Sequence, residues 1–431
     1  MINKFKIKTW IMISLVILIT LFIARPWIER TLNNINNTKE YSIDFIDDSG
    51  YRIRMEKPAG TIISLYSAHT ENLYSLGLDR EIVGVGSSEI YPYSVLQKTV
   101  YDYRSDPERV LAVHPDVVFI RPFIERHSPD FVKSLRRAGI IVVSLYPDNF
   151  NEFDDYILKL GLITGKTKTA RKKLEAFHLE LEELREDFEG IESVVKVYFE
   201  SSDREYKTVT KNSFAAYAID IAGGINIAND AVAIEEGSSI AIYGVEKILE
   251  KADEIDVYVT QRGVMGAGGN YHSISIRPGF YAIKAIINNR ILEINQKIIS
   301  CPTFRFTKGV KTLKRSFYPE KYDVIKKYDD DYNITRFELA EILIKYIHEP
   351  IFVPTKSYYK DLDKTHYYGN FKDVLIDDIR FDIIETSMRK SFFKSEVVDG
   401  EEYFYPDKNV TREEFARIIY ILSDLKNNDD I

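Results

Sequence analysis

The chain has 431 residues, of which 45% are hydrophobic and 29% charged, an ordinary globular composition that is long enough for two or three domains. Its net charge of −8 and the absence of a dominant basic motif argue against nucleic-acid binding. The single cysteine, Cys301, excludes an internal disulfide and cannot anchor a zinc cluster.

The N-terminal segment indicates export. Three lysines precede an uncharged, mainly apolar run, TWIMISLVILITLFIA, at residues 9–24. The run is short for a ~30 Å hydrocarbon core, but cleavage after Ala24 would place Phe22 at the −3 position, where a signal peptidase needs a small residue. We therefore favour a retained signal anchor at 1–28 over a cleaved signal. The bulk of the chain then lies outside the cell, after a polar linker at 29–40.

From residue 41 the pattern is that of an α/β protein. A turn at 48–50 between two short β-type segments predicts a hairpin. Helical segments alternate with short apolar strands, which we predict at 61–65, 82–85, 117–120 and 140–145. Such alternation predicts a largely parallel sheet covered on both faces, and we assign residues 41–150 to an N-terminal lobe.

A long helical stretch follows, with apolar residues at helical spacing and heavy charge elsewhere. We predict one helix across residues 151–190, with Gly161 and Gly165 as points of interruption near its start. The strand–helix alternation then resumes and predicts a second lobe over 191–320, with strands at 194–199, 257–260 and 291–294. The expected fold is therefore two Rossmann-like lobes joined by one long helix.

The last part of the chain, residues 321–431, is charged and rich in tyrosine, and it contains a weak internal repeat. The segment YNITRFELA (332–340) resembles KNVTREEFA (408–416). Each contains Thr-x-x-Glu at the start of a helical pattern, which predicts a capping box. We expect a small, mainly helical C-terminal domain.

The middle of the chain resembles the class III periplasmic binding proteins of ABC importers, the group that captures vitamin B12, haem and iron–siderophores. Four segments carry the resemblance, in family order: TIISLYSAHTENLYSLGLDREIVGVGSSEIYP (61–92), DPERVLAVHPDVVFI (106–120), SFAAYAIDIAGGINIAND (213–230) and VEKILEKADEIDVYVT (245–260). The resemblance implies a ligand cleft between the lobes, a small-molecule ligand, and an ABC permease with its ATPase as partners. It implies neither a cofactor nor a metal, and no catalytic motif was found.

Loops at the carboxyl ends of strands supply the candidate ligand contacts, because open α/β sheets bind ligands there. Arginine suits carboxylates, catecholates or oxyanions, and tyrosine stacks on rings. For each of these side chains, packing between the lobes or an ion pair on the surface is the alternative. The candidates are Tyr66, Ser67, His69, Tyr103, Arg104, Ser105, Arg121, Tyr146, Lys211, Arg262 and Arg277.

The resemblance also implies two docking sites. In the family an acidic residue on each lobe meets arginines of the permease, and Glu108 and Glu246 occupy the matching positions. The C-terminal repeats resemble S-layer homology modules, which implies that Arg336 and Arg412 bind an acidic cell-wall polysaccharide. The alternative for this tail is a small helical unit packed on the binding lobes.

Two other functions are compatible with the sequence. A molybdate or tungstate carrier could use the same scaffold, and FTKGVKTLKRSFYPEKY (306–322) is similar to segments of such proteins. A structural envelope protein attached through the C-terminal modules would bind no small molecule at all.

Overall fold

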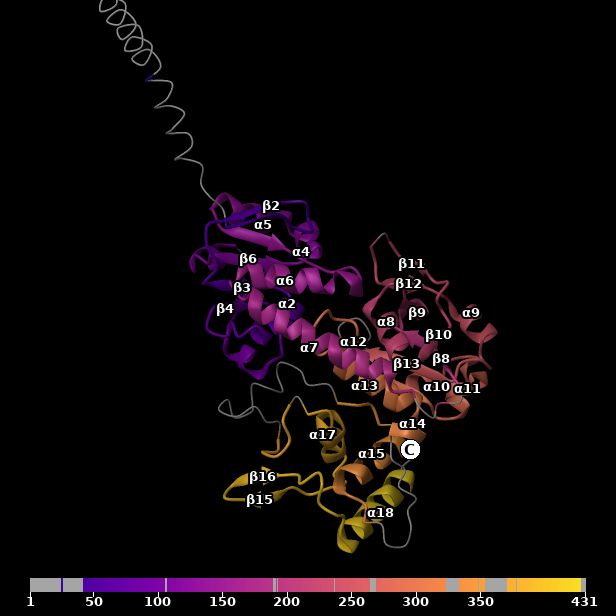
Figure 1. The fold of residues 1–431 in the computed structure, drawn as a ribbon. Coiled ribbons are helices and arrows are strands. Elements are labelled where there is room, and N and C mark those ends of the chain that lie inside the picture. The colour runs from indigo at the N-terminus through magenta and orange to yellow at the C-terminus, as the bar shows by residue number, and fades with distance from the viewer. Residues whose placement is uncertain are drawn as a thin grey trace, which may run out of the picture.

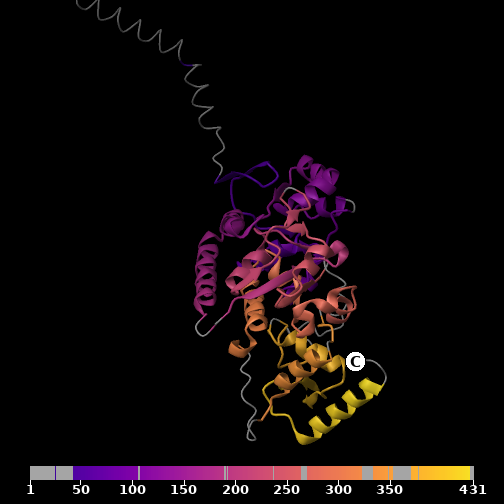
Figure 2. The same cartoon turned by 90° about the vertical axis from the view of Figure 1, so that its right-hand side faces the viewer.

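The computed structural model describes residue 25 and residues 42–427, apart from 105–106, 189–190, 192, 236, 264–268, 323–332, 348, 353–369 and 377. It contains two α/β lobes, which lie side by side in Figure 1 and one above the other in Figure 2, with a smaller C-terminal unit below them. The expected signal anchor lies outside the described residues except for Arg25. Within the described part of the chain, no helix has both the length and the apolar character needed to span a bilayer.

The first lobe is built on a five-stranded parallel sheet in the order β5-β4-β3-β6-β7. Every residue of β3 and β6 is buried, as expected for central strands covered on both faces. The predicted hairpin is confirmed as β1 (Ile43–Ile46) and β2 (Arg52–Met55). The sheet strands are β3 (Ile62–Ser64), β4 (Ile82–Val85), β5 (Thr99–Val100), β6 (Val117–Ile120) and β7 (Ile141–Ser144).

The helices of this lobe alternate with its strands, and α2 packs on β3 and α5 on β7. In α5, Phe131, Val132 and Leu135 form the buried stripe at helical spacing, and Pro129 occupies the favoured first position. The helices are α2 (Ser67–Ser75), the 3₁₀ turn η1 (Tyr93–Gln97), α3 (Glu108–Leu111), α4 (Pro122–His127) and α5 (Pro129–Arg137).

The second lobe contains a four-stranded parallel sheet in the order β10-β8-β13-β14, and beside it a small antiparallel sheet, β11-β12-β9. Its strands are β8 (Val195–Glu200), β9 (Lys207–Val209), β10 (Gly224–Asn226), β11 (Val232–Ala233), β12 (Ile240–Ile242), β13 (Val257–Arg262) and β14 (Ile291–Asn295). Its helical elements are η3 (Arg204–Tyr206), α8 (Phe214–Ile221), α9 (Val245–Glu250), α10 (Tyr271–Ser275), η4 (Phe280–Ala282), α11 (Lys284–Ile287), α12 (Gln296–Ile299), α13 (Phe306–Phe317) and α14 (Pro319–Tyr322).

The expected single helix between the lobes is two helices. After the turn η2 (Phe150–Glu152), α6 (Phe153–Ile163) ends and α7 (Thr167–Glu186) begins in a new direction. Gly165 has a φ of +70°, a left-handed conformation that ends α6. A Cβ on Gly161 would lie 2.9 Å from the Cβ of Ala170, so glycine permits the close contact of the two helices. Helix α7 packs on α6 at one end and on α8 and α13 further along (Figure 1).

A second connection joins the lobes, and it was not predicted. After β14 the chain returns to α2 of the first lobe, where Lys297 Nζ donates to Ser67 Oγ at 2.6 Å and Asn72 Nδ2 donates to the Pro302 carbonyl at 2.8 Å. The Arg305 guanidinium donates two hydrogen bonds to the Glu71 carboxylate, at 2.6 and 2.8 Å. We call these contacts, between Ser67, Glu71 and Asn72 of α2 and residues 297–305, the α2 clamp.

The C-terminal unit has its own apolar core, which includes Leu339, Phe371, Phe381 and Phe404. Both predicted capping boxes are present: Thr335 and Glu338 bond each other's backbone N–H, as do Thr411 and Glu414. The two repeats pair with each other through an antiparallel bridge at Thr335 and Asn409. The elements are α15 (Arg336–Tyr346), α17 (Phe381–Arg389), β15 (Glu396–Val398), β16 (Glu401–Tyr403) and α18 (Arg412–Asn427).

Candidate functional site

Three predicted residues meet at the carboxyl edge of the first sheet. Tyr66 and Arg121 are the last extended residues before α2 and α4, and Tyr146 follows β7. Because β3, β6 and β7 are neighbours in the sheet, these side chains converge. The Arg121 Cζ lies 5.0 Å from the centre of the Tyr66 ring, and the Tyr66 and Tyr146 ring centres are 6.0 Å apart.

The second lobe supplies the other side of this site. Asn295 caps α12 by accepting from the Lys297 backbone N–H at 2.9 Å, which places Lys297 in the first turn of the helix. Its ammonium reaches Ser67, directly after Tyr66 in the chain. The Ser239 side chain of the second lobe lies near the Tyr146 hydroxyl. We call Tyr66, Ser67, Arg121, Tyr146 and Lys297 the interlobe site.

The interlobe site carries positive charge. Arg121 is half-buried between the rings of Tyr66 and Phe123, and among the described residues no carboxylate forms an ion pair with it or with Lys297. Burial raises the pKa of Tyr146 to about 12 and the pKa of Tyr66 well above its ordinary value. Both hydroxyls therefore stay protonated at neutral pH. The arrangement offers two cations, hydroxyl donors and aromatic walls, which suits an anionic ligand that carries rings.

His69 is not part of the interlobe site, contrary to the prediction. It is fully buried, and its two ring nitrogens contact the Tyr156 hydroxyl at 2.8 Å and the Ile120 carbonyl at 3.0 Å. This pairing fits a neutral ring, in which Nε2 donates to Ile120 and Nδ1 accepts from Tyr156. Burial, with a smaller contribution from Arg121, lowers the pKa of His69 to about 4. His69 therefore stabilises the wall behind the site and does not contact a ligand.

Two predicted arginines of the second lobe are engaged by other segments. Arg277 forms a buried ion pair with Glu200, at 2.5 and 3.1 Å, and Glu200 also accepts from the Tyr258 hydroxyl at 2.6 Å. Arg262 donates to Glu293 at 2.8 Å and to the Ile351 carbonyl at 2.7 Å. Because each guanidinium is held by a carboxylate, neither is available to a ligand in this structure.

The remaining candidates lie elsewhere. Arg104 is exposed, 4.3 Å from the centre of the Tyr103 ring and 3.6 Å from Asp102, and Ser105 lies outside the described residues. Lys211 is exposed and lines a separate cavity. No group of three or more His, Cys, Asp or Glu side chains that could hold a metal ion occurs in the described ranges.

Sequence reasoning missed Lys297, although a signal for it exists. Lys297 follows a predicted strand, as Tyr66 and Arg121 do, and every such position is a candidate in an open α/β sheet. The segment after β14 that carries Lys297 also brings Cys301 close to the interlobe site, and burial raises the pKa of the Cys301 thiol. Cys301 therefore remains a neutral, buried side chain.

The two glutamates expected to contact a permease lie in comparable places. Glu108 is in the first turn of α3, and Glu246 is in the first turn of α9. Both side chains are exposed, one on each lobe. The geometry therefore leaves both carboxylates accessible to a partner.

The two C-terminal arginines differ sharply, and the prediction for Arg336 is wrong. Only 1% of Arg336 is exposed, because its guanidinium is inserted beside the Phe404 ring and lies 3.2 Å from Glu396 and 3.3 Å from Glu414. Glu414 belongs to the other repeat, so Arg336 joins the repeats and cannot reach a polysaccharide. Arg412, at the equivalent place in the second repeat, is exposed.

Comparison with known families gives two matches. The periplasmic binding protein family matches residues 62–298, more than half of the chain, and the S-layer homology domain matches residues 394–416. An uncharacterized ABC transporter substrate-binding lipoprotein, YvrC of Bacillus subtilis, is 25% identical over 290 residues, covering 66% of this chain and 88% of that protein. The vitamin B12-binding protein of Vibrio campbellii is 24% identical over 262 residues, covering 60% of this chain and 90% of its own length.

Solved structures share the fold. A possible iron-binding periplasmic protein from Staphylococcus epidermidis superposes with a TM-score of 0.54 at 23% identity, covering 61% of this chain and all of that one. The periplasmic heme-binding protein RhuT from Roseiflexus gives a TM-score of 0.51 at 21% identity, covering 61% of this chain and 98% of that one. The likeness supports an α/β fold with two lobes, each containing a parallel sheet.

Because His69 is buried, we predict that its ring is protonated only at acidic pH. Because its folded-state pKa of about 4 lies below the value of ~6.5 in an unfolded chain, the unfolded chain binds the proton first as pH falls. This histidine therefore costs stability progressively from pH 6.5 down to pH 4, by about 3 kcal/mol in total. In an NMR titration the His69 resonance, assigned through a His69→Gln variant, should remain that of neutral imidazole at pH 5. A midpoint near ~6.5, the value for an unburied imidazole, would contradict the burial.

Proposed function

This chain belongs to the periplasmic binding protein family, the extracytoplasmic substrate-binding components of ABC importers, and from that premise we propose that it captures an iron–siderophore, haem or corrinoid and delivers it to an ABC permease. Members of this family have no catalytic activity, so the function is capture and delivery. The observation that carries the choice of ligand is the pair of cations, Arg121 and Lys297, beside the Tyr66 and Tyr146 rings.

The charge of the site supports an anionic chelate. A haem presents carboxylates and a siderophore presents catecholate or carboxylate oxygens, and each also offers a broad apolar or aromatic surface to tyrosine. Arg121 already lies over an aromatic ring, so its planar group is oriented before a ligand arrives. Pre-orientation lowers the entropic cost of binding. A molybdate or tungstate ion would use the cations and hydroxyls and leave the rings without a role.

The ligand can be identified by thermal unfolding of the full chain with haemin, ferrichrome, ferric enterobactin, cyanocobalamin, molybdate and tungstate. A ligand that binds only the folded state raises the melting temperature. For the chelate that binds, we expect Arg121→Gln to weaken affinity about 10- to 100-fold, since a charge-assisted hydrogen bond contributes about 1.5–3 kcal/mol.

Arg137→Gln, an exposed arginine on α5, is the matched control and should leave the affinity unchanged. A larger stabilisation by molybdate or tungstate than by any chelate would favour an oxyanion carrier. Stabilisation by none of the six compounds would favour a structural envelope protein.

We further propose that Glu108 and Glu246 dock the loaded protein on the permease. Exposed carboxylates in the first turns of helices on both lobes suit arginines of a partner. The double change Glu108→Lys and Glu246→Lys should abolish uptake in cells while leaving ligand affinity unchanged. Glu182→Lys on α7 with Glu250→Lys at the far end of α9 is the control pair, and it should preserve uptake. If the Glu108 and Glu246 variant lost ligand affinity, these residues would belong to the ligand-binding surface, and the proposed docking role would be wrong.

The cell-envelope attachment that we propose combines the N-terminal signal anchor with the S-layer homology segment. The match at 394–416 includes Arg412, which is exposed at the start of α18 and able to meet an acidic wall polymer. In sedimentation with purified cell walls, Arg412→Gln should reduce binding of the full chain without changing its melting temperature. Arg336→Gln should instead destabilise the C-terminal unit. Wall binding that survives Arg412→Gln would exclude Arg412 as the contact.

A further inference from the structure

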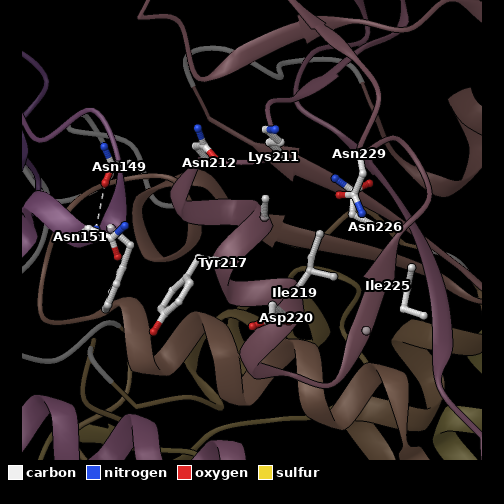
Figure 3. Close-up of a pocket in the computed structure, with 13 residues that line it drawn as sticks. Asn149, Asn151, Lys211, Asn212, Tyr217, Ile219, Asp220, Ile225, Asn226 and Asn229 are labelled. Carbon is white, nitrogen blue, oxygen red and sulfur yellow. Dashed lines mark hydrogen bonds between the residues drawn. The ribbon is translucent and has the colours of Figure 1, made fainter.

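A cavity of about 620 Å³ lies on the second lobe, between α8, β10 and the turn that leads into α6 (Figure 3). No residue of the interlobe site lines it. Figure 3 shows Asn149, Asn151 and Tyr217 at one end of the cavity and Asn226 and Asn229 at the other. We call it the asparagine groove.

The lining of the asparagine groove is polar but carries little net charge. Five of its side chains are carboxamides, each able to donate and accept hydrogen bonds: Asn149, Asn151, Asn212, Asn226 and Asn229. Its two charged residues, Lys211 and Asp220, have opposite signs. Such a lining suits a neutral ligand that has many groups able both to donate and to accept, and it gives no advantage to an anion.

One carboxamide, that of Asn226, is the main evidence that the groove binds a ligand. Asn226 is only 5% exposed, and its Oδ1 accepts from the Ala228 backbone N–H at 3.0 Å, which fixes the orientation of the amide. Its Nδ2 has no hydrogen-bond partner among the described residues. A buried N–H donor without an acceptor is costly, and such groups are rare in folded proteins unless they have a functional partner. This nitrogen has almost no accessible surface, so a ligand oxygen reaches and satisfies it only once the lining of the groove moves slightly aside.

The groove also has a rigid aromatic wall. The Tyr217 ring stacks on Phe150, with ring centres 3.9 Å apart and planes inclined by 21°. Because Phe150 belongs to the turn before α6 and Tyr217 to α8, this stack fixes the two sides of the groove against each other. Tyr217 is half-buried, so it adds an apolar surface without a large loss of side-chain freedom on binding.

We propose that the asparagine groove binds a neutral sugar, as a mono- or disaccharide or as one residue of a longer glycan. Neighbouring sugar hydroxyls donate and accept together, which matches the carboxamides, and the C–H face of a pyranose ring matches an aromatic wall. This second site is independent of the chelate proposed for the interlobe site. It assigns the second lobe a carbohydrate-binding function.

The test uses the full chain in detergent micelles and follows saturation-transfer NMR and calorimetry with glucose, N-acetylglucosamine and N,N′-diacetylchitobiose. We expect at least one of these sugars to bind at millimolar concentration or tighter. Asn226→Asp keeps the acceptor for Ala228 and removes the donor, so it should weaken binding at least 10-fold. Asn229→Ala, at the exposed rim, should weaken binding several-fold without affecting the fold.

The controls separate this site from the interlobe site. Asn288→Asp, an exposed asparagine at the end of α11, and Arg121→Gln should both leave sugar binding unchanged. The proposal is overturned if none of the three sugars binds, or if binding survives both Asn226→Asp and Asn229→Ala. A stronger response to glucuronate than to glucose would also overturn it, because the groove would then select an anion.

Discussion

The ion pair between Glu71 and Arg305 is the contact on which the arrangement of the lobes depends. Glu71 is 4% exposed in α2, and two hydrogen bonds attach its carboxylate to the guanidinium of Arg305, directly before α13. The Arg305 guanidinium also lies 3.9 Å from the centre of the Tyr91 ring. A buried carboxylate that loses its partner costs about 3–5 kcal/mol, so the chain cannot easily release residues 297–305 from α2. Together with α7, the clamp gives the lobes two separate connections.

Because the α2 clamp holds the lobes together, the interlobe site is formed before a ligand binds. The clamp includes Lys297 and Ser67, which are themselves members of the interlobe site. The contact that joins the lobes therefore also places a cation of one lobe beside the aromatic wall of the other. A cleft fixed in this way needs little ordering when it binds, in keeping with a protein whose function is to capture a ligand and pass it on. The same stiffness keeps Glu108 and Glu246 at a constant separation, which suits recognition by one permease.

Local patterns predicted the first-lobe hairpin, both capping boxes and the strands β3, β4, β6, β7, β8, β13 and β14, because these depend on residues close together in the chain. The short strands β5, β9 to β12, β15 and β16 were not predicted. The positions of Tyr66, Arg121 and Tyr146 followed from parallel-sheet topology. Predictions failed where a partner comes from a distant segment, as for Arg277 with Glu200 and Arg336 with Glu414. An arginine after a strand or in a repeated motif looks the same in sequence whether it faces solvent or a buried carboxylate. The clamp was missed for the same reason, since Glu71 and Arg305 are separated by 234 positions.

The two lobes are held in one relative position, and a distance between them measures this directly. Spin labels at Lys133 on α5 and Lys247 on α9, both with exposed side chains, report the separation of the lobes by double electron–electron resonance in a Cys301→Ser background. We expect one narrow distance distribution in the ligand-free protein, and a broader one after Glu71→Gln weakens the clamp. A broad or two-peaked distribution with the clamp intact would show that the lobes move freely, and would contradict a preformed interlobe site.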